Sequence, residues 1–348
     1  MNSDSADLIR PQYFSPGDPA AREYLRHHGY TVFKSVVTQE QCKISLGHFW
    51  DWIREVSEQQ VIPGDVDSYH HWPAHADNSA ILYYQGIGQS EFCWSIRTQP
   101  NVIKAFTTLW RNDDLLTSFD GGCIMRPWVH NSLWKTRRSW FHVDQNPLVY
   151  PDFDCIQGLV NLLPMTSDSG ANLLIPGSHK HFSTYTSRFP ETVSNLPKDQ
   201  HYFEIPQRDP VLNNSNFIPL RLELGVGDLL CWDSRTAHCS CPGTNGKAVE
   251  TESNLLRATV FVCMVPRSMA KPTVIKARKQ AIESQTTTTH RPHLFSPTNA
   301  YMDVEARVKR GVYLKFPKKS TFMTPQRLHL IGYSSKEVQK VSEFTHSR

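Results

Sequence analysis

The apolar residues between positions 38 and 56 recur three and four positions apart, which is the spacing of one face of an amphipathic helix. They are Cys42, Leu46, Phe49, Trp50, Ile53 and Val56. Thr38 followed three residues later by Gln41 is a capping-box pattern, so we expect this helix to begin there. A shorter helix is predicted over residues 18–28, with Gly29 as its C-terminal stop. Both helices are expected to pack against a core.

Short apolar segments separated by turn residues follow from position 115 to position 266. The clearest predicted strands cover residues 155–163, 171–175, 229–232 and 255–265, and an earlier strand covers residues 30–37. Short strands without a helix between each pair are typical of an all-β sandwich or jelly roll rather than of a βαβ array. The pattern therefore predicts a mainly β fold of the jelly-roll type with helices packed outside it.

No internal repeat or linker interrupts this pattern, so we expect one domain made of three regions. The first, residues 1–114, is helical and lies on the substrate side, and the second, residues 115–266, is the jelly-roll core with the candidate site. The third, residues 267–348, is a basic extension that packs on the core and begins with a predicted helix over residues 273–283. With 39% hydrophobic and 20% charged residues in a chain of 348, disordered and collagen-like classes are excluded.

The charge is unevenly distributed along the chain. The net charge is +4, but residues 268–348 hold 15 Lys and Arg against 5 Asp and Glu, a net of +10, and the rest carries −6. A basic extension can attract anions. No helix-turn-helix, zinc-finger or RNA-binding motif accompanies it, so nucleic acid is not expected as a partner.

The compartment is predicted from the amino-terminal residues and the cysteines. The chain begins with polar and acidic residues rather than a signal-like segment, and eight cysteines are too few for a disulfide scaffold. No apolar run reaches the ~20 residues that a membrane span needs. A cytoplasmic protein with reduced thiols and no membrane partner is expected.

The most informative residues for chemistry are His142 and Asp144. Residues two apart on a strand project to the same face, so an imidazole and a carboxylate are expected side by side. Two histidines and one carboxylate on one face of a redox metal leave three positions open for small molecules. His238 is the candidate third ligand because it follows a turn and an apolar strand, 94 residues after Asp144.

Two other metal sites are conceivable from the sequence. Cys239 and Cys241 beside His238 suggest zinc, but a structural zinc site usually needs a second spaced pair, and none appears. His70, His71 and His75 have no carboxylate or cysteine at ligand spacing, so we interpret them as loop residues.

Three segments together resemble the phytanoyl-CoA dioxygenase family of Fe(II)- and 2-oxoglutarate-dependent oxygenases. They read FHVD at 141–144, GANLLIPGSHK at 170–180 and GDLLCWDSRTAH at 227–238. Their order matches the family's metal motif, its Pro-Gly-Ser-His turn and its distal-histidine strand, and the resemblance covers about residues 21–266. It implies a double-stranded β-helix and three metal ligands that are also the catalytic residues, His142, Asp144 and His238.

The resemblance also implies the cofactors and the reaction. Fe(II), the cosubstrate 2-oxoglutarate and O₂ would oxidise a C–H bond of a small organic substrate, with release of succinate and CO₂. Related halogenating enzymes carry a small residue where this chain has Asp144, so the carboxylate favours hydroxylation over halogenation. The remaining alternatives are a non-catalytic jelly-roll protein that binds a ligand or serves as a scaffold, and a cupin-like metal enzyme that does not use 2-oxoglutarate.

The same resemblance gives candidates for binding 2-oxoglutarate. Arg257 matches the arginine on a strand after the distal histidine, and a guanidinium can bind a carboxylate through two hydrogen bonds. The gap from His238 to Arg257 is longer than the family commonly shows, which leaves Arg267 as the alternative if the intervening segment is not a hairpin. Ser240 would add a hydroxyl to the same carboxylate, and Arg126 matches a basic position near the cosubstrate or substrate.

Two amides complete the predicted cosubstrate pocket. Gln157 and Asn161 alternate with Leu159 on one face of a predicted strand, and buried amides need hydrogen-bond partners, so we expect them to line this pocket.

The identity of the substrate is not predicted, and neither is the oligomeric state. Four tryptophans are expected to form an apolar wall near the mouth of the site: Trp72, Trp128, Trp134 and Trp140. Lys135, Arg137 and Arg138 would suit a substrate with an anionic group.

Overall fold

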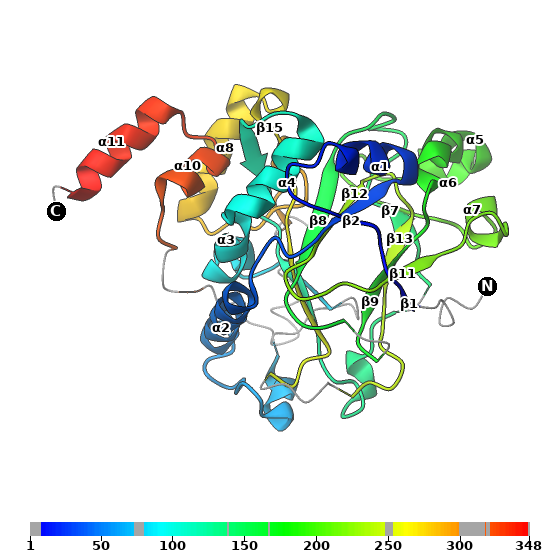
Figure 1. Cartoon of the computed structure of the whole chain (residues 1–348), viewed down its shortest axis with the longest axis horizontal. Coiled ribbons are helices and arrows are strands. Elements are labelled where there is room, and N and C mark those ends of the chain that lie inside the picture. The colour runs from blue at the N-terminus through cyan, green and yellow to red at the C-terminus, as the bar shows by residue number, and fades with distance from the viewer. Residues whose placement is uncertain are drawn as a thin grey trace.

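The structure is a computed structural model that describes residues 8–72, 80–137, 139–165, 168–247, 253–298, 317 and 321–346. Two large sheets form the centre of the molecule (Figure 1). The strands of the six-stranded sheet, in spatial order, are β1 (Leu8–Ile9), β11 (Leu220–Leu222), β9 (Ala171–Leu174), β13 (His238–Cys241), β7 (His142–Val143) and β10 (Phe203–Glu204). Those of the seven-stranded sheet are β2 (Tyr13–Phe14), β3 (Tyr30–Phe33), β12 (Leu229–Asp233), β8 (Ile156–Asn161), β14 (Arg257–Phe261), β6 (Gly122–Met125) and β4 (Ile81–Leu82). A separate pair joins β15 (Met264–Pro266) to β5 (Leu115–Thr117).

Within both large sheets most neighbouring strands are antiparallel and distant in sequence. β12, for example, pairs with β3 on one side and β8 on the other, and β13 pairs with β9 and β7. Over two stretches of the chain, β6 to β9 and β11 to β14, consecutive strands alternate between the two sheets. This arrangement is a double-stranded β-helix, or jelly roll, and confirms the predicted fold class.

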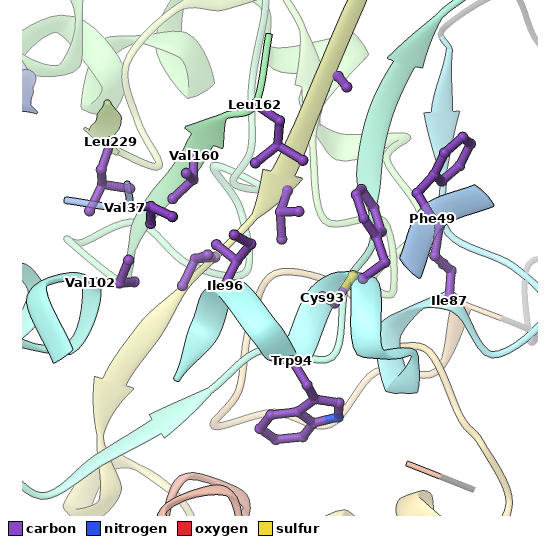
Figure 2. Packing of buried hydrophobic residues seen from close by; sticks show 14 of the residues in the cluster. Val37, Phe49, Ile87, Cys93, Trp94, Ile96, Val102, Val160, Leu162 and Leu229 are labelled. Atoms are coloured by element: carbon purple, nitrogen blue, oxygen red, sulfur yellow. The ribbon is translucent and has the colours of Figure 1, made fainter. Parts of the chain in front are cut away.

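Helices cover the outer face of the seven-stranded sheet. They are α1 (Ala20–His28), α2 (Gln39–Val56), α3 (Glu91–Arg97) and α4 (Pro100–Trp110). Figure 2 shows Val160, Leu162 and Leu229 meeting Ile96 and Val102 in one apolar cluster. Because alternate strand residues face the helices and the second sheet, both faces of β8 and β12 are buried, which agrees with the apolar residues that make up most of β12 and half of β8.

The two N-terminal helices begin or end as the sequence predicts. In α2 the Thr38 hydroxyl accepts from the backbone N–H of Gln41 at 3.2 Å, and the Gln41 side chain accepts from the Thr38 N–H at 2.9 Å. The predicted stripe is buried except Leu46, which is partly exposed. Gly29 ends α1 with φ 81°, a left-handed conformation that glycine adopts without strain.

Other predictions of local structure need correction. The strand predicted over residues 30–37 ends at Phe33, and Ser35 turns the chain with φ 49° while its N–H donates to Asp228. The segment 255–265 forms two strands, β14 and β15, in different sheets. Helices α3 and α4 were not predicted, although Pro100 stands at the start of α4, where its missing N–H costs nothing.

Beyond the core, short helices flank the six-stranded sheet and longer ones follow in the C-terminal region (Figure 1). The short ones are α5 (Tyr185–Arg188), α6 (Pro190–Ser194) and α7 (Pro210–Asn213), and the later ones are α8 (Pro272–Glu283), α10 (Pro325–Ile331) and α11 (Ser335–His346). α8, predicted over residues 273–283, is confirmed, and its buried Arg278 donates to the carbonyl of Thr117 at 2.6 Å and of Ile331 at 2.8 Å. The division of the chain into three regions stays a prediction.

Among the described residues, each helix is too short or too polar to cross a membrane.

Candidate metal centre

The structure brings His142, Asp144 and His238 together. His142 and His238 are register partners in the antiparallel pair β7–β13, and Asp144 follows β7, where its N–H donates to the carbonyl of Ser234 at 2.9 Å. His142 Nε2 lies 3.4 Å from one carboxylate oxygen of Asp144, and His238 Nε2 lies 3.1 Å from the other. The three ligand atoms lie within 4.8 Å of one another.

Backbone contacts fix which nitrogen each histidine presents to this centre. Nδ1 of His142 lies 3.2 Å from the carbonyl of Trp140, and Nδ1 of His238 lies 2.9 Å from the carbonyl of Thr236. A carbonyl only accepts, so each Nδ1 carries a proton, and Nε2 is the nitrogen that each histidine presents to the centre. Metal-binding histidines are commonly held in this way.

The Asp144 carboxylate is ionised. Burial alone would raise its pKa, but the imidazoles of His142 and His238 hold the pKa of Asp144 well below its usual range. Gln157, on β8, donates from Nε2 to the same carboxylate at 2.8 Å. Two imidazole nitrogens and a carboxylate oxygen converging in this way fit a divalent cation such as iron, with open positions left for small molecules.

Aromatic rings surround the two histidines. Trp140 stacks on His142 with the ring centroids 4.5 Å apart and the planes 5° from parallel. The Trp232 ring lies 5.2 Å from the His238 ring. Tyr202, which is 48% exposed, stands nearly perpendicular to His142 at 6.3 Å. The triad therefore lies among aromatic side chains, one of which reaches the surface.

Arg257, the first residue of β14, is directed across the space between the two sheets. Its guanidinium is 2% exposed and donates from Nη2 to Oδ1 of Asn172 at 2.8 Å. Within the described part of the chain, its Nε and Nη1 have no hydrogen-bond partner. Asn172, on β9, is the register partner of Ser240 on β13. A buried guanidinium with two unsatisfied donors is costly unless an anion binds there.

Arg267 lies elsewhere and is already paired. Its Nε lies 2.7 Å from Oδ1 of Asp114, and Nη2 donates to the carbonyl of His329 at 3.1 Å. The unsatisfied donors of Arg257 distinguish it from this alternative.

Two further predicted residues have partners outside the centre. The amide nitrogen of Asn161 donates to the carbonyls of Leu163, Leu224 and Gly225, so this side chain closes the turn that precedes β12. Arg126 donates to the carbonyl of Tyr69 at 3.1 Å.

Aromatic contacts hold the Arg126 guanidinium, which lies 5.4 Å from the ring centroid of Trp72 and 4.7 Å from that of Trp134. Burial lowers the pKa of Arg126 to about 10. Trp72 belongs to the apolar cluster with Phe49 and is 6% exposed, so its predicted place in a wall at the mouth needs correction.

The zinc interpretation of Cys239 and Cys241 is not supported. Both thiols are buried, and burial raises the pKa of Cys239 well above its usual value, so this sulfur stays protonated. Strand alternation directs them away from the face of His238. Among the described residues, His142, Asp144 and His238 form the one cluster suited to a metal; His75 and Arg138 lie outside the described residues.

Three residues that contact Arg257 or Asp144 were not predicted from the sequence. Asn172 stands in the segment 170–180, and its alternation with Leu173 on a strand was a signal for an inward amide. His290 and Arg291 both donate to the backbone carbonyl of Asp144, at 3.2 and 3.1 Å. Their signal was the run His290-Arg291-Pro292-His293, which places three basic side chains within four positions.

Comparisons with known proteins agree with this geometry. A family model described as phytanoyl-CoA dioxygenase (PhyH) matches residues 25–249. The chain is 29% identical to Ava biosynthesis cluster protein O of Aspergillus versicolor, over 78% of this chain and 85% of that protein. It is 25% identical to a putative phytanoyl-CoA dioxygenase of Dictyostelium discoideum, over 75% of this chain and 79% of that protein.

Among solved structures, a hypothetical protein from Escherichia coli shares the fold. The TM-score is 0.56 at 12% identity, with 94% of this chain and 86% of that chain covered.

Proposed function

The chain belongs to the phytanoyl-CoA dioxygenase family, whose enzymes depend on Fe(II), 2-oxoglutarate and O₂, and on that premise we propose that it oxidises a C–H bond of a small organic substrate. Succinate and CO₂ would be released from 2-oxoglutarate. The observation that carries the proposal is the convergence of three ligand atoms within 4.8 Å, with both Nδ1 atoms held by carbonyls.

His142, Asp144 and His238 would hold the iron. When bound, the iron supplies the oxidising chemistry together with O₂ and 2-oxoglutarate, and the protein supplies binding and orientation. Gln157 would fix the direction of the Asp144 carboxylate through its 2.8 Å hydrogen bond. Because the carboxylate occupies a position that a halide would need, we propose hydroxylation as the outcome.

Arg257 would bind the far carboxylate of 2-oxoglutarate. Its Nε and Nη1 are the unsatisfied donors, and Asn172 holds the remaining side of the guanidinium. Ser240 is two residues beyond His238 on the same strand face, opposite Asn172, so its hydroxyl would reach the same subsite. Asn161 and Arg126 are left out of the proposed cosubstrate site because the amide nitrogen of Asn161 and Nη1 of Arg126 donate to backbone carbonyls elsewhere.

The substrate would carry an anionic group and an apolar body. Arg137 is exposed and lies 5.1 Å from the ring centroid of Trp140, which itself stacks on His142. Lys135 lies 3.9 Å from the ring centroid of Trp128. A cation held on the aromatic ring that stacks on His142 suits a small organic anion, and Lys135 would add a second positive charge. The Aspergillus versicolor relative is named for a biosynthesis cluster, which agrees with a small-molecule substrate.

We propose a reducing compartment such as the cytoplasm as the site of action. All eight cysteines are buried free thiols, and the proposed ferrous centre also favours a reducing environment.

The test is conversion of 2-oxoglutarate to succinate by the metal-free protein reconstituted with Fe(II), without added substrate. We expect slow turnover in the wild type and a KM for 2-oxoglutarate raised about 100-fold or more in Arg257→Ala, because two charged hydrogen bonds are lost. Arg267→Ala is the matched control and should keep the wild-type KM. No turnover in the wild type would indicate the non-catalytic alternative, and turnover independent of Arg257 would contradict the proposed cosubstrate site.

A further inference from the structure

A loop of the C-terminal region contacts the main chain of Asp144, one of the three candidate metal ligands. An isolated bridge between Thr288 and Pro297 closes a loop that contains His290, Arg291 and His293. Two side chains of this loop meet at one atom, the backbone carbonyl oxygen of Asp144. His290 donates to it from Nε2 at 3.2 Å, and Arg291 donates to it from Nη2 at 3.1 Å.

Arg291 is fully buried, and each of its three guanidinium nitrogens lies close to a polar atom of another segment. Nε lies 2.7 Å from Oδ2 of Asp154, Nη1 donates to Nδ1 of His201 at 2.9 Å, and Cζ lies 4.3 Å from the ring centroid of Tyr150. These partners come from the loop that follows Asp144 and from the segment before β10. Arg291 therefore connects these two segments, and its own loop, to the main chain of Asp144.

Asp154 is ionised in its ion pair with Arg291. Burial would raise the pKa of Asp154, but the hydrogen bond from His293 at 3.0 Å and the charge of Arg291 lower it below its usual value. A lysine could not reproduce these contacts, because its point charge lacks the planar set of donors that meets Asp154, His201 and the carbonyl together.

From these contacts we propose that His290 and Arg291 are positioning residues for the metal centre, holding the Asp144 main chain so that its carboxylate faces His142 and His238. The N–H of Asp144 donates to the carbonyl of Ser234. His290 and Arg291 hold the Asp144 carbonyl, so both backbone polar groups of this residue are bonded. The proposal rests on the proposed function in taking Asp144 as an iron ligand. The family match ends at residue 249, so this chain would complete its metal site with a segment beyond it.

The loss of either donor should weaken metal binding. Outer partners of metal ligands typically change metal affinity about 10- to 100-fold when they are removed. A residue that served only the stability of the fold would lower the melting temperature without changing the affinity of the folded protein for metal.

The experiment measures the Kd for Co(II) of the full chain, freed of metal, by competition with a chelator. The variants are Arg291→Lys and His290→Ala, the second at a half-buried residue whose loss the fold tolerates better. Arg97→Lys is the matched control, because Arg97 is also fully buried, pairs with one carboxylate, Asp120, at 2.9 Å, and donates to a backbone carbonyl, that of Gly88.

We expect Arg291→Lys and His290→Ala to bind Co(II) about 10-fold or more weakly, and Arg97→Lys to keep the wild-type Kd even where it melts earlier. Wild-type affinity in His290→Ala and in folded Arg291→Lys would overturn the proposal, and so would an equal loss in Arg97→Lys. If Arg291→Lys does not fold, the Kd of His290→Ala for Co(II) alone tests the proposal. A wild-type chain that binds no Co(II) would contradict the proposed function itself, and the positioning role with it.

Discussion

His142 and His238 stand opposite each other across the β7–β13 pair, with ring centroids 4.4 Å apart, although 96 residues separate them along the chain. Antiparallel pairing sets this relationship, because register partners project to the same face of a sheet. Asp144 reaches the same centre from the residue position after β7. The metal site is thus a consequence of strand register in the jelly roll, and a local turn alone could not form it.

Removing the amide of Gln157 should weaken the centre without unfolding the protein. Gln157→Met keeps about the length of the side chain but leaves one oxygen of the Asp144 carboxylate without its donor. We expect Co(II) affinity to fall about 10-fold, as for other partners of metal ligands. Titration of the metal-free protein, followed by chelator competition, measures the change, and an unaltered Kd would show that Gln157 does not orient the carboxylate.

Asn161→Ala should lower the stability of the fold without changing the binding of 2-oxoglutarate. This amide donates to three backbone carbonyls around the turn before β12 and is fully buried, so its loss should cost about 1–3 kcal/mol of the free energy of unfolding. The KM for 2-oxoglutarate should stay at the wild-type value. Urea denaturation and succinate formation measure the two quantities; a raised KM with normal stability would restore Asn161 to the cosubstrate site.

Acid should destabilise the metal-free protein through His201. Burial and the charge of Arg291 lower the pKa of His201 to about 4, against about 6.5 for an unfolded chain. The unfolded state therefore binds the proton first, and stability falls as the pH decreases from about 6.5 towards 4.

His201→Asn tests this pH dependence because asparagine keeps an acceptor for Arg291 but does not titrate. Its melting temperature should change less than that of the wild type over the same pH range. Parallel curves for the two proteins would show that His201 does not contribute to the acid sensitivity.

The sequence predicted those parts of the molecule that depend on local pattern. Alternation and turn residues indicate the strands, Thr38 and Gln41 mark the start of α2, and the His142–Asp144 spacing forces both side chains to one face. The turn and apolar strand before His238 made it the candidate third ligand. The family resemblance supported that choice and supplied Arg257, because spacing alone cannot tell which distant strands become neighbours.

The features that the sequence did not predict depend on contacts between distant segments of the chain. Asn161 ends its strand, so its amide meets the turn instead of the interior that alternation indicates. Trp72 was expected near the mouth because it is close in sequence to other candidates, but it packs beside Phe49 in the core. The contact between Arg291 and Asp144 joins residues 147 positions apart, and no local pattern predicts it.

The most direct test of the proposed iron site is equilibrium dialysis of the metal-free chain against Fe(II) under anaerobic conditions, with bound iron measured per chain. The wild type should bind one Fe(II), and His238→Ala should retain almost none at the same free concentration, whereas Cys239→Ala, which alters the neighbouring residue on the opposite strand face, should bind like the wild type. Stoichiometric iron in His238→Ala, or loss of iron in Cys239→Ala alone, would contradict the assignment of His142, Asp144 and His238 as the metal ligands.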